Sequence, residues 1–438
     1  MPATYIPARG CLGAGAAGLV AARELQREGH SVVVYEKGDQ VGGTWVYTPE
    51  VELDLLGADP NRATVHSSVY KSLRINFPRE MMGFQHYPFV SQKDGSGDPR
   101  RFPGHDEALF YLQNFAKEFH INELVRFHTE VLNVNMLENN KWKVKSRKQD
   151  GVIVAEEEEI FDAVVVCNGH YTEPLVAEIP GISSWPGKQI HSHNYRVPKP
   201  FQDQIVILIG NKASGFDIKR EIAKVAEEVH VADRSVADDT YEKQAEYDNM
   251  WHHSMIERAN EDRTVVFRNG KVISADVIIH CTDYKYYFPF LADVIKDGIV
   301  TVDDNRIHPL YKHIPQKALP FPLSEYQSRW IAGVLSNRIE LPSEEEMMED
   351  IKAFYSELEA SGKPKRHTHY MSDSFYEYMD FLAAQCGFPG MEKWRKEMEY
   401  ATMKNVIARP GRYRDEWDDD HLIEEAHKDF IKYISLCK

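Results

Sequence analysis

The sequence predicts an α/β protein with two Rossmann-like dinucleotide-binding domains, one inserted in the other. Two strand–glycine loop–helix patterns support this prediction, with loops at residues 13–18 and 210–215. Strand-like runs at 162–167 and 276–281 indicate where the chain returns to each sheet. We therefore expect a larger, discontinuous domain of residues 1–172 and 284–438 and an inserted domain of residues 173–283.

The composition limits the classes of partner. The chain has 438 residues, of which 42% are hydrophobic and 27% charged, as in globular proteins. A net charge of −16 argues against a nucleic-acid partner and against an anionic membrane surface. No apolar run approaches the roughly 20 residues of a membrane-spanning helix, and the first residues do not resemble a signal peptide. Five widely spaced cysteines favour a reducing compartment without disulfides or a zinc site, so we expect a cytoplasmic protein that binds no metal.

The first glycine loop has the context of a dinucleotide fingerprint. A helical stretch follows it, and the next strand, 31–35, ends in Glu36, placed to reach ribose hydroxyls. Glycines allow a tight turn and a close approach of the backbone to pyrophosphate, which rests on the helix N-terminus. The residues predicted to bind this cofactor are Gly13, Ala14, Gly15, Ala16, Ala17, Gly18 and Glu36.

The strand before this loop departs from the expected pattern. Arg9 and Gly10 occupy positions where a buried parallel strand normally carries Val or Ile. Either this strand is short and frayed, or the N-terminus is altered relative to a well-folded relative.

A second glycine pair, Gly42-Gly43, follows Glu36 and precedes Thr44-Trp45. One interpretation is a turn followed by a core tryptophan. The other is a second backbone approach to a large cofactor, which favours FAD over NAD because more surface must be enclosed. On that interpretation Gly43, Thr44 and Trp45 bind FAD in the domain formed by residues 1–172 and 284–438.

The second glycine loop follows a buried strand at 205–209 and precedes a helix. Lys212 takes the place of its middle glycine, which leaves Gly210, Asn211, Ser214 and Gly215 as candidate cofactor contacts. The next strand ends in Asp233-Arg234-Ser235. Arg234 and Ser235 favour a 2′-phosphate and hence NADPH, whereas Asp233 favours a free 2′-hydroxyl. An ordinary α/β unit with a solvated arginine is the alternative.

The sequence argues against a metal site and against a disulfide reductase. His191 and His193 are two apart in an extended segment, but no acidic or cysteine partner accompanies them, so we predict no metal there. No CxxxxC pair follows the first loop, which argues against a disulfide reductase.

Several ordered motifs resemble those of flavin-containing monooxygenases. The spacing Trp185-x-Gly187-x-x-x-His191-x-x-x-Tyr195 matches the identifying motif of that family, FxGxxxHxxxY/F, with Trp for Phe. Residues 72–80 resemble the segment that bears its active-site asparagine, here Asn76. Residues 42–45, 166–170 and 280–284 also have counterparts, and residues 189–196 are most similar to the plant glucosinolate S-oxygenase-like branch.

The resemblance implies FAD and NADPH as cofactors and O2 as a substrate. NADPH would reduce FAD, O2 would add to the flavin C4a, and the terminal oxygen would pass to a soft nucleophile. A small thioether giving a sulfoxide is the leading hypothesis, and an amine is the alternative; Baeyer–Villiger oxygen insertion uses a differently elaborated motif. The resemblance gives Asn76 a catalytic and cofactor-binding role and gives His191 a structural or NADP-side role. A turn residue is the alternative for Asn76.

Three departures from the family pattern bear on function. Asp283 and Lys212 stand where the family usually has a glycine and an uncharged residue. After Ile314 the chain reaches Pro315 and Pro320 almost at once, where an apolar segment ending in a final FAD-domain strand is expected. Losing a central parallel strand would weaken flavin retention, so a catalytically impaired, splice-like family member is a further hypothesis.

Overall fold

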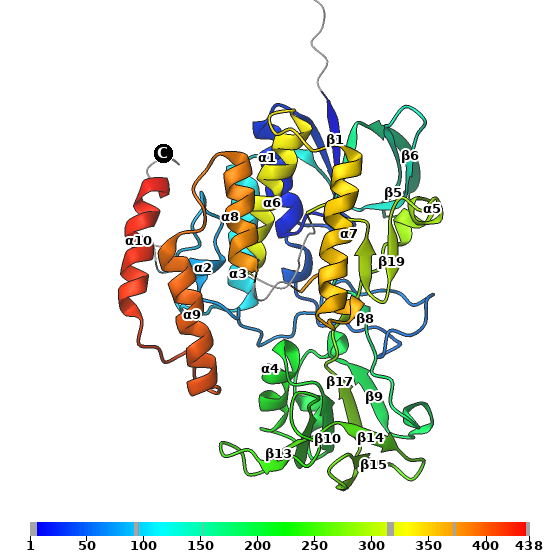
Figure 1. Ribbon diagram of the computed structural model, residues 1–438. Coiled ribbons are helices and arrows are strands. Elements are labelled where there is room, and N and C mark those ends of the chain that lie inside the picture. The colour runs from blue at the N-terminus through cyan, green and yellow to red at the C-terminus, as the bar shows by residue number, and fades with distance from the viewer. Residues whose placement is uncertain are drawn as a thin grey trace, which may run out of the picture. The chain divides into compact units, whose positions relative to one another are not determined.

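The fold was analysed in a computed structural model that describes residues 7–91, 95, 97–151, 153–312, 319–370 and 374–434. The chain divides into two compact units (Figure 1). Unit 1 comprises residues 1–45, 74–169 and 286–438, and unit 2 comprises residues 46–73 and 170–285. Insertion of one unit in the other is as predicted, but residues 46–73, which we assigned to the larger domain, belong to unit 2.

Unit 1 is organised around a parallel sheet with the order β3-β2-β1-β7. Its strands are β1 (Ala8–Leu12), β2 (Ser31–Tyr35), β3 (Val125–Arg126) and β7 (Ala163–Val166). Helix α1 (Ala16–Arg27) joins β1 to β2 and buries an apolar face that includes Leu19, Val20 and Leu25. Helix α6 (Pro320–Leu335) packs along α1. This sheet and its helices place the first glycine loop at the carboxyl ends of the strands.

Of the two alternatives for the first strand, a short and frayed strand is wrong. Strand β1 pairs with β2 over all five residues and with β7 over four. Gly10 leaves room for the Phe161 ring, whose nearest atom would lie 3.5 Å from an added Cβ. Arg9 is 5% exposed, lies 3.6 Å from the Asp162 carboxylate and donates to the Leu335 carbonyl at 3.2 Å. Residues distant in sequence therefore pair with Arg9 and pack beside Gly10.

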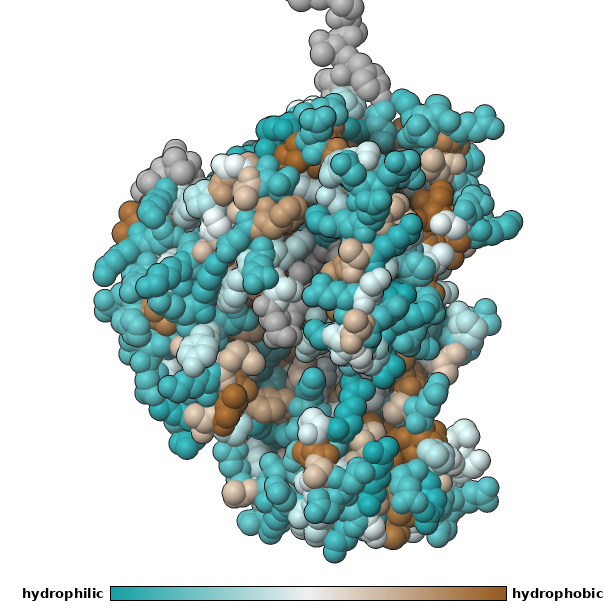
Figure 2. Space-filling model, in the orientation of Figure 1, coloured by the Kyte–Doolittle hydropathy of each residue, from teal (hydrophilic) through white to brown (hydrophobic). Residues whose placement is uncertain are grey.

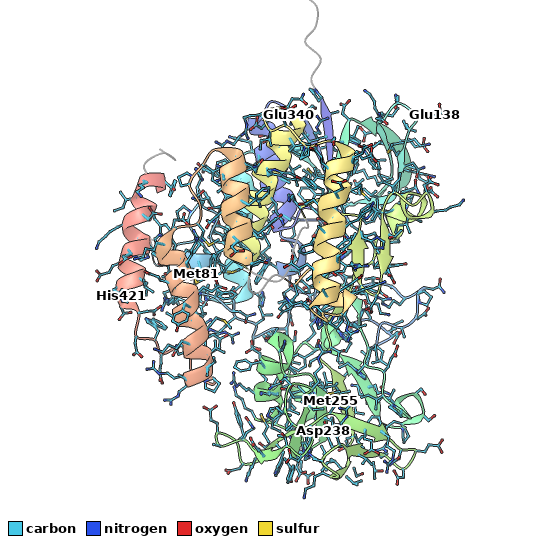
Figure 3. All side chains as sticks on the ribbon, in the orientation of Figure 1. Met81, Glu138, Asp238, Met255, Glu340 and His421 are labelled. Carbon is cyan, nitrogen blue, oxygen red and sulfur yellow. The ribbon has the colours of Figure 1, made fainter. Side chains whose placement is uncertain are left out.

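The rest of unit 1 comprises short sheets and a helical layer. The strands are β4 (Thr129–Met136), β5 (Trp142–Asp150) and β6 (Ile153–Phe161), which form an antiparallel meander, and the pair β19 (Thr301–Asp303) and β20 (Arg306–His308). The helices are α2 (Arg79–Met82), α3 (His105–Glu118), α5 (Ala292–Lys296), α7 (Glu344–Ala360), α8 (Phe375–Cys386), α9 (Lys393–Ala408) and α10 (Asp420–Ile434). Met81, labelled in Figure 3, belongs to a core that joins α2 to α6, α8, α9 and α10.

Unit 2 is built on a six-stranded sheet with the order β12-β13-β11-β10-β17-β9, parallel except at β12. Its strands are β9 (Lys188–His191), β10 (Ile205–Ile209), β11 (Glu228–Ala232), β12 (Tyr241–Lys243), β13 (Met250–His253) and β17 (Val277–His280). Helix α4 (Ala213–Ile222) follows β10. The smaller strands are β14 (Ile256–Ala259), β15 (Thr264–Phe267), β16 (Val272–Ser274), β8 (Glu173–Pro174) and β18 (Tyr284–Lys285).

Residues 46–73 are held in unit 2 by buried polar contacts. Arg62 contacts the carboxylates of Glu52 at 2.8 Å and Glu173 at 2.7 Å. The backbone N–H of Glu52 donates to the Asn194 side chain at 2.9 Å, and that of His191 donates to the Leu55 carbonyl at 2.8 Å. Apart from the Arg62–Glu52 pair, these contacts join residues more than a hundred positions apart, so no local sequence pattern reveals them.

The two parallel sheets differ at one edge. In unit 2, β17 lies between β10 and β9, and His280 is 0% exposed. In unit 1, β7 takes the place of β17, but within the described ranges no strand pairs with its outer side and Val166 is 38% exposed. Residues 313–318, where the chain would enter the expected final strand, lie outside the described residues. The described sheet is thus one strand shorter at the edge where the sequence indicates a deletion.

The surface seen in Figure 2 is mainly hydrophilic, with small separate hydrophobic areas. This agrees with the large excess of acidic over basic residues. Among the described helices, none is long and apolar enough to cross a membrane.

A buried ion cluster ties α6 to the rest of unit 1. Glu325 is fully buried; it accepts hydrogen bonds from the Arg329 guanidinium and, at 2.5 Å, from the Gln85 backbone N–H. Arg23 of α1 lies 3.7 Å away. Burial raises the pKa of Glu325, but the charge of Arg329 and these hydrogen bonds outweigh burial and lower the pKa to about 2. The carboxylate is therefore ionised and its charge compensated.

We expect Glu325→Gln to lower the free energy of unfolding by about 3–5 kcal/mol, because Arg329 would stay buried without its counter-charge. Chemical denaturation at neutral pH measures this. Since folding lowers the pKa of Glu325, its stabilisation is complete above pH 4.5 and declines as the pH falls toward 2, so the two proteins should converge in acid. The control Glu359→Gln removes a carboxylate whose side chain is 60% exposed and should cost less than about 1 kcal/mol. Equal losses for both variants would contradict the assignment.

Candidate dinucleotide-binding sites

The first glycine loop turns closely against the end of strand β7. Gly13 has a φ of +109°, and a Cβ there would lie 2.5 Å from the Cys167 carbonyl oxygen. A Cβ on Gly18 would overlap the carbonyl oxygen of Gly13. The loop therefore accepts only glycine at both positions, as a turn that presents its backbone to pyrophosphate requires.

Helix α1 begins immediately after this turn. Its N-cap is Gly15, which has no side chain to bond the first backbone N–H groups, and these groups are left for an anion. Glu36 follows β2 and is half-buried. Its carboxylate accepts from the N–H of Ala14 at 2.8 Å and of Gly38 at 2.7 Å. Loop, helix end and acid thus stand together in the arrangement that fits a dinucleotide.

The second glycine pair packs on the first loop. The N–H of Gly42 donates to the Ala14 carbonyl at 3.0 Å. Gly43 has a φ of +56°, and a Cβ on it would lie 2.9 Å from the Gly15 Cα. Trp45 is half-buried, and its ring packs edge-on against Phe321 at the start of α6, with centroids 5.9 Å apart. The structure thus brings Gly43, Thr44 and Trp45 beside the predicted pyrophosphate loop.

The loop after β10 repeats the first. Gly210 has a φ of +100°, and a Cβ there would lie 2.5 Å from the Cys281 carbonyl oxygen. A Cβ on Gly215 would overlap the carbonyl oxygen of Gly210. Lys212 is the N-cap of α4, as Gly15 is of α1, with an extended backbone and an exposed side chain. A lysine is therefore accommodated in this loop, and the N-terminus of α4, with Ser214 in its first turn, remains open to an anion.

Asp233 and Arg234, which follow β11, differ in burial and in their contacts. Arg234 is exposed and makes no hydrogen bond or ion pair with the described residues. Asp233 is buried, and its carboxylate lies 3.1 Å from the Asn211 amide and 3.2 Å from a ring nitrogen of His252. Arg234 is therefore available to a ligand, whereas Asp233 is engaged within the protein.

Asn76 is exposed in unit 1, beyond the buried Ile75. Its side-chain oxygen accepts from the Arg414 guanidinium at 2.6 Å, and Arg414 also donates to the Ile75 carbonyl at 3.2 Å. The amide nitrogen of Asn76 donates to no described residue. Sequence reasoning missed Arg414, which lies 338 positions away in the segment between α9 and α10 and carries no motif.

His191 lies inside unit 2 rather than at a ligand surface. It is fully buried; one ring nitrogen lies 3.0 Å from the Asp283 carbonyl oxygen, and the other accepts from the His193 N–H at 3.1 Å. Burial lowers its pKa to about 3, so the ring is neutral. Asp283 has a φ of +81°, the left-handed conformation for which a glycine is usual. His191 thus supports the backbone of this turn.

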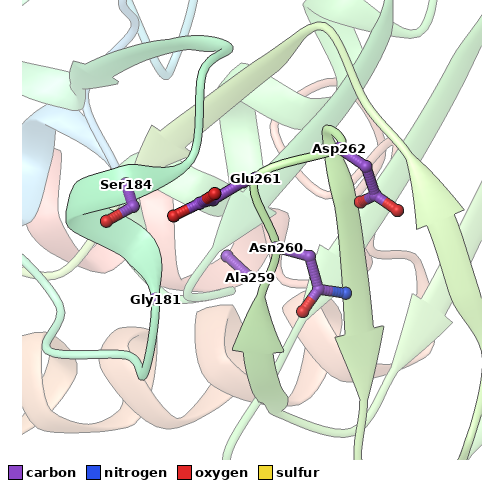
Figure 4. Close-up of a pocket in the computed structure, with 6 residues that line it drawn as sticks. All are labelled: Gly181, Ser184, Ala259, Asn260, Glu261 and Asp262. Carbon is purple, nitrogen blue, oxygen red and sulfur yellow. The ribbon is translucent and has the colours of Figure 1, made fainter.

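A surface depression in unit 2 lies apart from these residues. Figure 4 shows its lining by Gly181, Ser184, Ala259, Asn260, Glu261 and Asp262. None of the predicted cofactor residues lines it, and its two acidic side chains are unsuited to a phosphate.

Comparison with known proteins agrees with this geometry. A family model described as flavin-binding monooxygenase-like matches residues 9–238 and 236–391. Flavin-containing monooxygenase FMO GS-OX-like 2 of Arabidopsis thaliana is 59% identical, over 97% of this chain and 94% of that protein. Their alignment runs over 445 positions, more than the 438 residues here, so the chain lacks residues that this relative has.

Two solved structures are similar along nearly the whole chain. S-allyl-L-cysteine S-oxygenase from Allium sativum is 53% identical with a TM-score of 0.94, covering 98% of this chain and 99% of that one. Tmm from a Pelagibacter strain is 25% identical with a TM-score of 0.76, covering 93% of each chain. The family-model match over residues 9–238 includes both glycine loops.

Gly18→Ala tests the first loop. The added methyl group would overlap the Gly13 carbonyl oxygen, so we expect a loss of flavin absorbance in the purified protein and a lower melting temperature. The control is Gly10→Ala in the same unit, where the nearest atom lies 3.5 Å from the new Cβ and both properties should be retained. Full flavin content in Gly18→Ala would show that this loop does not hold the cofactor.

Proposed function

Because the chain belongs to the flavin-binding monooxygenase-like family, we propose that it oxygenates the sulfur of small thioethers. The enzymes of this family are FAD- and NADPH-dependent monooxygenases acting on small molecules, and so is this one. In the proposed reaction one atom of O2 forms the S–O bond of a sulfoxide. The other leaves as water, while NADPH supplies two electrons and is oxidised to NADP⁺. The similarity to S-allyl-L-cysteine S-oxygenase over 98% of the chain carries the proposal.

Backbone groups of the two loops would hold the cofactors. The N-terminus of α1 would bind the FAD pyrophosphate, and Glu36 would accept from the ribose hydroxyls. The N-terminus of α4 would bind the NADPH pyrophosphate, with Arg234 at the 2′-phosphate. FAD, when bound, takes the electrons of NADPH and activates O2. The contribution of the chain is binding, orientation and the exclusion of water.

Asn76 would act as a neutral hydrogen-bond donor at the reacting centre. Since its oxygen already accepts from Arg414, its amide nitrogen is directed away from that guanidinium. An amide donates a hydrogen bond without releasing a proton, which suits a site that must keep activated oxygen from decaying. Arg414 would be a positioning residue that orients this amide.

The impaired-member hypothesis has a specific observation in its favour. Strand β7 has no described partner on its outer side, and the alignment with the Arabidopsis relative indicates missing residues. Against it, α6 still begins beside Trp45, and the first loop keeps its geometry. An amine in place of the thioether would need the same cofactors and the same loops. The scattered cysteines continue to favour a cytoplasmic location.

We expect the purified protein to be yellow and to form one sulfoxide for each NADPH consumed with S-allyl-L-cysteine. Flavin absorbance, NADPH consumption and chromatographic detection of sulfoxide measure this. A tertiary amine serves as the competing substrate. Conversion of the amine but not the thioether would replace S- by N-oxygenation, and a colourless protein that FAD does not reconstitute would support the impaired-member hypothesis.

Replacing the donor should uncouple the reaction. For Asn76→Asp, whose side chain has the same shape but only accepts at neutral pH, we expect sulfoxide per NADPH to fall about tenfold or more and hydrogen peroxide to rise, with KM for NADPH little changed. Arg414→Ala should shift the same ratio less, and Arg414→Lys should partly restore it. A thermal melt and flavin content equal to those of the wild type are the controls. Unchanged coupling in Asn76→Asp would remove Asn76 from the reacting centre.

A further inference from the structure

Asp233, next to Arg234, carries a negative charge that would repel the 2′-phosphate of NADP. Asp233 follows β11 at the position where an acidic residue accepts the 2′-hydroxyl of NAD and repels the 2′-phosphate of NADP. Yet this enzyme depends on NADPH. An ionised carboxylate beside the proposed phosphate ligand needs a structural explanation.

Hydrogen bonds from within the protein occupy both oxygens of the Asp233 carboxylate. One oxygen of Asp233 accepts from the Ser235 backbone N–H at 2.8 Å and from its hydroxyl at 2.6 Å. The other accepts from the Asn211 amide at 3.1 Å and from the His252 ring at 3.2 Å. Two oxygens offer about four acceptor positions, so none remains for a ribose hydroxyl. Burial raises the pKa of Asp233, but these hydrogen bonds outweigh it and lower the pKa, so the acid is ionised.

A buried lysine fixes the orientation of Asn211. Lys219 of α4 is buried, and its ammonium lies 2.5 Å from the Asn211 side-chain oxygen. An ammonium can only donate, so the Asn211 nitrogen must turn toward Asp233. Burial lowers the pKa of Lys219 to about 8, which leaves it largely protonated at neutral pH. Donors from the glycine loop and β13 thus converge on Asp233, and Lys219 of α4 orients the first of them.

We propose that Asn211 and His252 are specificity-determining residues that mask Asp233 and thereby exclude NAD while permitting NADP at Arg234. The inference rests on the proposed NADPH site. It moves Asn211 from a direct cofactor contact to a positioning residue. It also explains how an acidic residue is compatible with a 2′-phosphate, because donors inside the protein fill its lone pairs and stabilise its charge.

The experiment measures the affinities of two probes that differ only in the 2′-phosphate, adenosine 2′,5′-bisphosphate and 5′-AMP, by calorimetry on the full chain. Wild type should prefer the bisphosphate. The unmasked variant Asn211→Ala/His252→Ala should lose at least about tenfold of this preference, because one carboxylate oxygen becomes free to accept the 2′-hydroxyl and to repel the phosphate. A ratio of affinities cancels any change at the pyrophosphate loop.

Adding Asp233→Asn to the unmasked variant should restore the preference to at least the wild-type value. The control Asp238→Asn, at an exposed residue labelled in Figure 3, removes the same charge nearby and should leave the ratio unchanged. An unchanged ratio in the unmasked variant, or an equal loss with Asp233→Asn present, would overturn the inference.

A second variant and the wild-type affinities separate failure of the masking from failure of the NADPH site. If the unmasked variant melts before the measurement, Lys219→Met gives the same test, since it frees the Asn211 amide to turn, and a wild-type ratio there would overturn the inference. Wild type that binds the bisphosphate no better than 5′-AMP would overturn the proposed NADPH site itself, which is distinct from failure of the masking alone.

Discussion

In each unit, a main-chain carbonyl oxygen lies too close to a glycine of the loop to leave room for a Cβ. The Cys167 oxygen faces Gly13, and the Cys281 oxygen faces Gly210, each at 2.5 Å from an ideal Cβ. The loop must pass this close to the end of the neighbouring strand for the following helix to start at the edge of the sheet. The helix N-terminus then presents its free N–H groups outward. The position of both proposed pyrophosphate sites therefore depends on the absence of two side-chain carbons.

The same close approach is found in both units. The strands whose ends face the loops differ, however, in how many neighbouring strands hold them. Strand β17 is held on both sides, while β7 has β1 on one side only within the described ranges. The carbonyl of Cys167 follows directly after β7, so the end of a less supported strand forms one wall of the first loop. Helix α6 compensates in part, because it packs along α1 and is tied to it by the buried Glu325 cluster. Flavin retention should thus be more sensitive than NADPH binding to anything that loosens unit 1.

The sequence predicted those features whose signals are local. Both glycine loops and the inserted arrangement follow from periodicity and motif order, whereas the shortened segment after Ile314 stays an expectation from the family resemblance. The frayed alternative for β1 failed because the Arg9 guanidinium pairs with Asp162 and the Phe161 ring packs beside Gly10. The assignment of residues 46–73 failed because Arg62 joins Glu52 to Glu173. Arg414 carries no motif of its own. In each case the deciding contact joins positions far apart in the chain, and such contacts leave no local pattern.

Because the chain is acidic, the residues at the end of β11 have a particular part in cofactor binding. A protein of net charge −16 must bind two polyanionic cofactors, and the first loop carries no cationic side chain. Backbone N–H groups can bind pyrophosphate in either unit. NAD and NADP have the same pyrophosphate, so these groups cannot distinguish the two. That distinction must come from side chains at the end of β11, where Arg234 attracts the extra phosphate and Asp233 would oppose it. Filling all the lone pairs of Asp233 from within the protein removes the competing hydrogen-bond acceptor while leaving the arginine exposed.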